Sequence, residues 1–87
     1  MTKPAKTLKR ILSGSVDASL RFADVVGLLE RLGFVQRVRG DHHIFTRDGV
    51  EEILNLQPRG GMAKPYQVKQ VRQVIVRYQL GEPSDAE

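Results

Sequence analysis

Two adjacent histidines, His42 and His43, are the residues of this sequence best suited to acid–base chemistry. Histidine is the side chain whose ordinary pKa lies near neutrality, so it can accept and return a proton at physiological pH. Gly40 precedes the pair and arginines stand on both sides of it. If the segment is a β-strand, successive side chains point to opposite faces, and the two imidazoles diverge. They therefore cannot act together on one scissile bond unless the strand is bulged at this point.

Three interpretations of this histidine pair are open from the residues alone. In the first, one imidazole is partly buried and hydrogen-bonded, the other is solvated, and neither takes part in catalysis. In the second, the histidines bind a metal ion, although the nearby Asp41 and Asp48 form no recognised ligand spacing with them. In the third, one histidine is a general acid–base among cationic side chains, which disfavour the imidazolium and leave the ring free to remove the proton of a ribose 2′-hydroxyl. This last interpretation needs no metal, and we expect no cofactor.

Other residues of the sequence are less suited to catalysis. The serines lack the G-x-S-x-G context of serine hydrolases, and the adjacent Glu51 and Glu52 diverge if they lie on a strand. Phe45 and Tyr66 could stack on nucleic-acid bases, but aromatic side chains of a small protein are more often part of its core.

Positive charge dominates the chain. Its 14 Lys and Arg residues outnumber 10 Asp and Glu, which gives a formal net charge of +4, and the stretch from Ile53 to Gly81 has no acidic residue. A one-sided positive field attracts nucleic acid through counterion release, although a charge run alone is equally compatible with a solvated surface. The cations predicted to bind RNA are Arg37, Arg39, Arg47, Lys64, Lys69, Arg72 and Arg77.

Length and composition indicate one domain. The 87 residues predict a core at about residues 20–81, an N-terminal extension before it and an acidic tail at residues 82–87. The sequence has no cysteine, no apolar run typical of a signal peptide, and no stretch near the roughly 20 apolar residues of a membrane span. We therefore expect a cytoplasmic protein that makes no contact with a membrane.

Apolar periodicity and helix-stop residues predict three helices. They cover residues 7–14, residues 22–32 and the segment from Pro65 to Gly81. Thr7 is the expected N-cap of the first helix, and Gly14 and Gly33 stand where the first and second helices should stop. Residues 13–19 are predicted to be a linker.

Three strands are predicted between the second and third helices, at residues 34–38, 42–47 and 50–57. Asp48-Gly49 predicts a type I′ hairpin turn, in which both central residues have positive φ. The expected fold is therefore α+β, with a three-stranded antiparallel meander that the helices cover on one face. The other face of the sheet should remain open.

Two segments resemble the HicA (YcfA-like) toxin family. They are Leu28-Leu29-Glu30-Arg31-Leu32-Gly33-Phe34 and Arg39-Gly40-Asp41-His42-His43-Ile44-Phe45. Members of the family have a helix ending in Gly-Phe, a basic strand, the motif Gly-Ser-His-His-aliphatic-aromatic, a hairpin, a third strand and a basic helix. The resemblance covers roughly Phe22 to Tyr78. This sequence departs from the family in having Asp41 where a serine is usual, and in its extra N-terminal helix.

The resemblance implies a fold similar to double-stranded-RNA-binding domains, cleavage of mRNA, and neutralisation by a HicB-type antitoxin. The family's catalytic histidine falls on His42 or His43, and His42 is preferred because relatives with only one histidine have it two residues after the glycine. A protein of this kind is an RNA endonuclease, a hydrolase of phosphodiester bonds in a type II toxin–antitoxin system. The alternative is a non-catalytic RNA-binding module, or an antitoxin-bound regulatory module, of the same fold.

Overall fold

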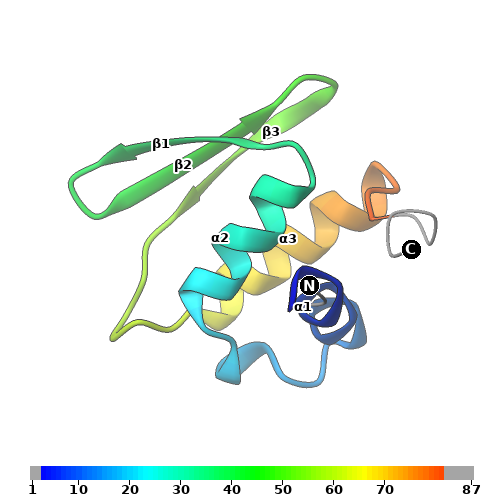
Figure 1. Ribbon diagram of the computed structural model, residues 1–87, viewed down its shortest axis with the longest axis vertical. Coiled ribbons are helices and arrows are strands. Elements are labelled where there is room, and N and C mark those ends of the chain that lie inside the picture. The colour runs from blue at the N-terminus through cyan, green and yellow to red at the C-terminus, as the bar shows by residue number, and fades with distance from the viewer. Residues whose placement is uncertain (1–2, 82–87) are drawn as a thin grey trace.

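A computed structural model describes residues 3–81 of the chain, which form three α-helices, a short 3-10 helix and a three-stranded antiparallel sheet (Figure 1). The elements are α1 (Lys3–Ser13), η1 (Asp17–Ser19), α2 (Phe22–Arg31), β1 (Val35–Arg39), β2 (His42–Arg47), β3 (Val50–Leu56) and α3 (Pro65–Arg77). The predicted α+β class and its helix–helix–strand–strand–strand–helix order are confirmed. The predicted acidic tail lies outside the described residues.

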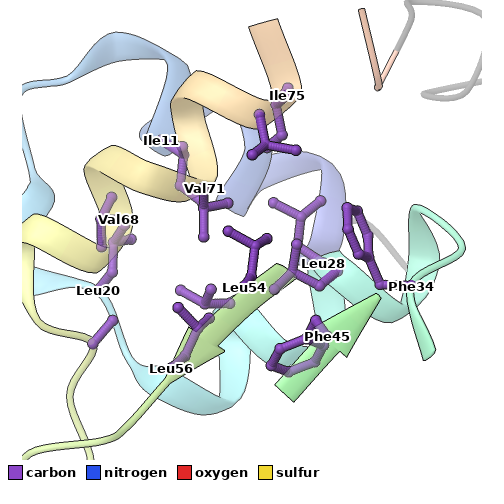
Figure 2. Close-up of a cluster of buried hydrophobic side chains, with 14 of the residues drawn as sticks. Ile11, Leu20, Leu28, Phe34, Phe45, Leu54, Leu56, Val68, Val71 and Ile75 are labelled. Carbon is purple, nitrogen blue, oxygen red and sulfur yellow. The ribbon is translucent and has the colours of Figure 1, made fainter. Parts of the chain in front are cut away.

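The helices lie on one face of the sheet. Figure 1 shows α2 and α3 beneath the strands, with α1 packed against both helices on the side away from the sheet. The strand order is β1-β2-β3, so β2 is central. On the covered face Phe45, Leu54 and Leu56 are buried against apolar side chains of the helices (Figure 2). The opposite face of the sheet is open, as the meander predicts.

Two helices end in the same hydrogen-bonded motif. At the end of α2 the N–H of Gly33 donates to the Glu30 carbonyl and that of Phe34 to the Leu29 carbonyl, both at 3.0 Å, and Gly33 has a φ of 95°. These two bonds define a Schellman motif, which requires a left-handed residue after the helix. The predicted stop at Gly33 is confirmed.

The end of α3 repeats this motif without a glycine. Gln79 takes the left-handed position, with a φ of 54°, and its N–H and that of Leu80 bond back to α3. The predicted stop at Gly81 was therefore too late. The beginning of α1 is also corrected, because the helix already covers Lys3 and Thr7 is buried within it, not at its N-cap. The linker predicted at residues 13–19 contains η1, whose three residues are too few to show a periodicity.

The turns at the two ends of β2 are both tight. Arg47 pairs with Val50 across Asp48-Gly49, but Gln79 is the only non-glycine residue of the range 3–81 with positive φ. Asp48 thus does not adopt the type I′ conformation predicted for it, and Gly49 alone has positive φ, at 87°. A register shift between Phe45 and Arg47 accompanies this turn. The hairpin itself is confirmed, and only its turn type was wrong.

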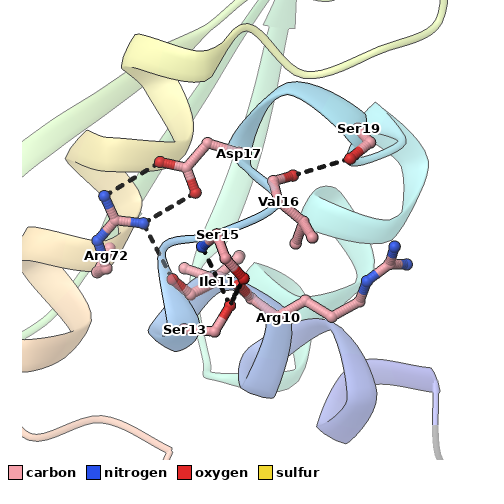
Figure 3. A network of polar contacts seen from close by, with 8 residues as sticks. All are labelled: Arg10, Ile11, Ser13, Ser15, Val16, Asp17, Ser19 and Arg72. Atoms are coloured by element: carbon pink, nitrogen blue, oxygen red, sulfur yellow. Dashed lines mark hydrogen bonds and ion pairs between the residues drawn. The ribbon is translucent and has the colours of Figure 1, made fainter.

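An ion pair fixes the N-terminal segment to α3. The Arg72 guanidinium donates to both carboxylate oxygens of Asp17, at 3.0 and 3.1 Å, and to the Ile11 carbonyl at 3.0 Å (Figure 3). These side chains are largely shielded from solvent, with 20% of Arg72 and 18% of Asp17 exposed. One arginine therefore joins η1, the end of α1 and the middle of α3.

Candidate active site

His42 begins β2 on the open face of the sheet. The tight turn at Gly40, whose φ is 59°, returns the chain so that His42 pairs with Arg39 of β1. The His42 side chain is 51% exposed, and its Nδ1 lies 3.1 Å from Oδ1 of Asn55 on β3. Because an amide oxygen can only accept a hydrogen bond, Nδ1 carries the proton in this contact. In the neutral ring Nε2 then carries the lone pair, as a general base requires.

A carboxylate stands beside this free nitrogen. Oδ1 of Asp41 is 4.0 Å from His42 Nε2, which is too far for a hydrogen bond. Its other oxygen accepts a 2.7 Å hydrogen bond from the Gln57 amide, and this bond is the main reason why the pKa of Asp41 lies below its ordinary value. Asp41 is thus an anion at neutral pH, close enough to attract a protonated imidazole and without occupying its nitrogen.

His43 points to the covered face, as strand alternation predicts. Its Nδ1 lies 2.6 Å from Oε1 of Gln36, and its ring meets that of Phe22 edge to face, with centroids 4.8 Å apart. The Gln36 amide nitrogen in turn donates to a Glu30 carboxylate oxygen at 3.2 Å. Since this bond orients the Gln36 amide, its oxygen must face the imidazole. His43 is therefore half-buried and fixed in place, whereas His42 is exposed.

The arginines of β1 accompany His42. Arg37 pairs with Ile44 and Arg39 with His42, and directly paired residues share a face of the sheet. Both arginines are exposed and stand on the open face. Arg47 is half-buried and alternates to the face of His43 and Phe45, so the structure separates it from the other two.

The cations of α3 and of the loop before it lie in different environments. Arg72 donates to Asp17 and to the Ile11 carbonyl, so part of its guanidinium is used within the fold. Its role in RNA binding stays a prediction. Arg77 donates to Glu52 at 3.0 Å across a more exposed contact. Lys69 is exposed, and Lys64 lies near the Tyr66 ring. The seven predicted RNA-binding cations therefore do not form one continuous surface.

Comparison with known protein families agrees with this architecture. Residues 22–76 match the family model described as "HicA toxin of bacterial toxin-antitoxin". This chain belongs to the HicA toxin family. The match spans α2, the whole sheet and nearly all of α3, and both histidines lie inside it. The helix α1 and η1 precede the HicA match, so the Arg72–Asp17 ion pair joins the family domain to a segment outside it. No curated protein and no solved structure matches the chain.

Metal binding was one of the three interpretations of the histidine pair. Within residues 3–81, no three His, Cys, Asp or Glu side chains are clustered so that they could hold a metal ion. In the same range no helix has both the length and the apolar character needed to cross a membrane.

The polar partners of the two histidines and of Asp41 were not predicted. Asn55 and Gln57 come from β3 and the residue after it, and Gln36 comes from β1. Asn55 stands between the buried Leu54 and Leu56, and this alternation alone assigns it to the open face. Pairing it with His42 additionally requires the register of β2 and β3, which the corrected hairpin turn sets.

Proposed function

We propose that this HicA-family protein is a toxin that cleaves mRNA, with His42 as its general acid–base. The observation that carries the proposal is the state of His42. Its imidazole is exposed, held at Nδ1 by Asn55 and open at Nε2, and it stands beside Arg39 on an uncovered face. An imidazole held in this way can approach a ribose without rearrangement of the fold.

The chemistry that suits this arrangement is attack by the ribose 2′-hydroxyl on the neighbouring phosphorus. Nε2 of His42 removes the hydroxyl proton, the 2′-oxygen forms a bond to phosphorus, and the bond from phosphorus to the 5′-oxygen breaks. The leaving 5′-oxygen takes up a proton from solvent water, and the upstream fragment retains a 2′,3′-cyclic phosphate. Arg37 and Arg39 supply positive charge for the phosphate, which becomes more negative in the transition state. The Asp41 carboxylate, 4.0 Å from Nε2, stabilises the imidazolium that proton transfer creates.

Membership in a toxin–antitoxin family also supports a protein partner for the same face. We propose that a HicB-type antitoxin covers His42 and the arginines of β1, and so prevents RNA from reaching them. The open sheet and the free edges of β1 and β3 offer backbone groups that a second chain can pair with. Hydrogen exchange in the complex should show protection in β1 and β2. Protection confined to α1 would argue for inhibition at another surface.

The catalytic proposal is tested by comparing the alanine variants of His42 and His43. His42→Ala should lower RNA cleavage by about 10²–10⁴-fold, which is the usual effect of losing one positioned acid–base group. Its melting temperature should change little, since an exposed side chain contributes about 0.5 kcal/mol or less. His43→Ala is the matched control, because it removes the same group from the covered face, where it packs on Phe22 and bonds to Gln36. It should lower stability and retain cleavage when folded.

Other results for these variants would contradict the role proposed for His42. A folded His42→Ala protein that cuts RNA at the wild-type rate removes His42 from the mechanism, and an inactive, folded His43→Ala protein transfers the role to His43. If neither substitution affects cleavage, the enzymatic proposal fails. RNA binding without cleavage by the wild type would favour the alternative, a non-catalytic RNA-binding module.

A further inference from the structure

Tyr66 is the most exposed aromatic side chain of the chain. The three phenylalanines are buried, with at most 7% exposed, and Tyr78 is half-buried with its hydroxyl bonded to Glu52. Tyr66, in the first turn of α3, is 60% exposed. Its hydroxyl makes no hydrogen bond within residues 3–81. More than half of this aromatic side chain is therefore open to solvent, although aromatic side chains favour burial.

Positive charge flanks the exposed ring. The Lys64 ammonium lies 6.0 Å from the ring centroid, and Lys69, also exposed, follows Tyr66 by three residues and so projects from the same side of α3. Neither lysine forms a salt bridge within residues 3–81. An exposed aromatic ring with lysines beside it matches the combination that binds single-stranded nucleic acid, in which bases stack on the ring and cations neutralise the phosphates.

Hydrogen bonds connect the start of α3 with the candidate active site. The buried Gln67, which follows Tyr66, accepts a hydrogen bond from the main-chain N–H of Gln57. The Gln57 side chain donates to Asp41, which precedes His42. The positive charge of Lys64 also contributes to the lowered pKa of Asp41, so the lysine lies within electrostatic range of that carboxylate. In Figure 1 the β1–β2 turn and the loop after β3 accordingly lie at the same end of the molecule.

We propose that Tyr66 is a stacking platform for one base of single-stranded RNA, with Lys64 and Lys69 binding the adjacent phosphates. This subsite rests on the proposed function, since its ligand is the RNA that His42 cleaves. The subsite lies on α3, outside β2, which carries the histidines. It therefore binds a nucleotide that is some distance along the RNA from the scissile bond. Stacking is available to all four bases, so the subsite supplies affinity and selects unpaired RNA over duplex.

The test separates stacking from charge by measuring binding alone. A labelled single-stranded 2′-O-methyl RNA, which lacks the attacking hydroxyl, is titrated with each variant at several salt concentrations, and the bound fraction is followed by fluorescence anisotropy. Tyr66→Ala should weaken binding roughly 5- to 140-fold, the equivalent of one lost stack, without changing the salt dependence. Tyr66→Phe should bind like the wild type. Lys64→Ala and Lys69→Ala should each lower the slope of log affinity against log salt by about one.

Val76→Ala is the matched control for the loss of exposed apolar area. Val76 is 61% exposed near the other end of the same helix, and its loss should leave RNA binding unchanged. Binding by Tyr66→Ala that equals the wild type, or an equal loss in Val76→Ala, would overturn the stacking site.

The outcome also separates this inference from the nuclease proposal. If the wild type cleaves natural RNA and Tyr66→Ala binds it undiminished, the subsite is wrong and the proposed function stands. If Tyr66→Ala weakens binding but the wild type cleaves nothing, the subsite stands and the nuclease proposal fails. A wild type that does not bind RNA overturns both.

Discussion

We expect Arg72→Ala to act mainly by destabilising the fold, and not by weakening RNA binding. The substitution removes the guanidinium that joins α3 to η1 and to the end of α1 (Figure 3). It leaves the Asp17 carboxylate, which is only 18% exposed, without its partner. The Ile11 carbonyl loses its bond to Arg72 as well. The cost should therefore be larger than that of an ordinary surface substitution.

The magnitude follows from the geometry and exposure of the pair. Breaking a fully buried ion pair costs about 3–5 kcal/mol, whereas an exposed pair contributes about 0–1 kcal/mol. The Arg72–Asp17 pair is bidentate and about one-fifth exposed, so we expect a loss of about 2–3 kcal/mol in the free energy of unfolding. For a domain of this size that loss corresponds to a decrease of about 10–20 °C in Tm.

Thermal and chemical denaturation of four variants, Arg72→Ala, Asp17→Ala, Asp17→Ala/Arg72→Ala and Arg77→Ala, measures this contribution. Arg77→Ala is the control, because its ion pair with Glu52 has similar length but Arg77 is 62% exposed, and it should cost less than about 1 kcal/mol. The double variant Asp17→Ala/Arg72→Ala should be less destabilised than the sum of the two single variants. A decrease in Tm for Arg72→Ala no larger than that for Arg77→Ala would refute the structural role of this pair.

Three further outcomes are expected. Gln79→Gly should raise the free energy of unfolding by about 0.5–1 kcal/mol in urea denaturation, because Gln79 has a φ of 54° after α3; a destabilised variant would contradict this. The hydrogen bond from Tyr78 lowers the pKa of Glu52, so folding gains stability above the ordinary value of 4.5 and loses it as pH falls through the lower folded pKa. Tyr78→Phe should therefore show a smaller loss of stability on acidification than the wild type, and an unchanged pH dependence would disprove the coupling. Arg39→Ala should lower the salt slope of RNA binding by about one, whereas an unchanged slope would exclude Arg39 from the phosphate contacts.

Local patterns predicted most of the fold. The apolar spacing of residues 22–32 and the following Gly33 gave α2 to within one residue. The alternation of β2 correctly placed His42 and His43 on opposite faces, since a strand has a side-chain period of two. By the same rule Leu54 and Leu56 share the buried face of β3.

The parts that could not be predicted depend on long-range contacts. Arg72 resembles any other cation of a basic helix, and only its contact with Asp17, 55 residues away, shows its structural use. Gln79 takes a conformation that favours glycine, so helix-stop rules pointed to Gly81 instead. The partners of the histidines required the strand register, which sequence spacing alone leaves open.

The central claim, that His42 activates a ribose 2′-hydroxyl, is tested most directly by the ends of the RNA products. Purified wild-type protein is incubated with single-stranded RNA in the presence of a chelator, and the fragments are analysed by mass spectrometry. The mechanism predicts upstream fragments ending in a 2′,3′-cyclic phosphate, and no cleavage at a position where the 2′-hydroxyl has been replaced by hydrogen. Cleavage at that deoxy position, or activity that disappears with the chelator, would contradict it.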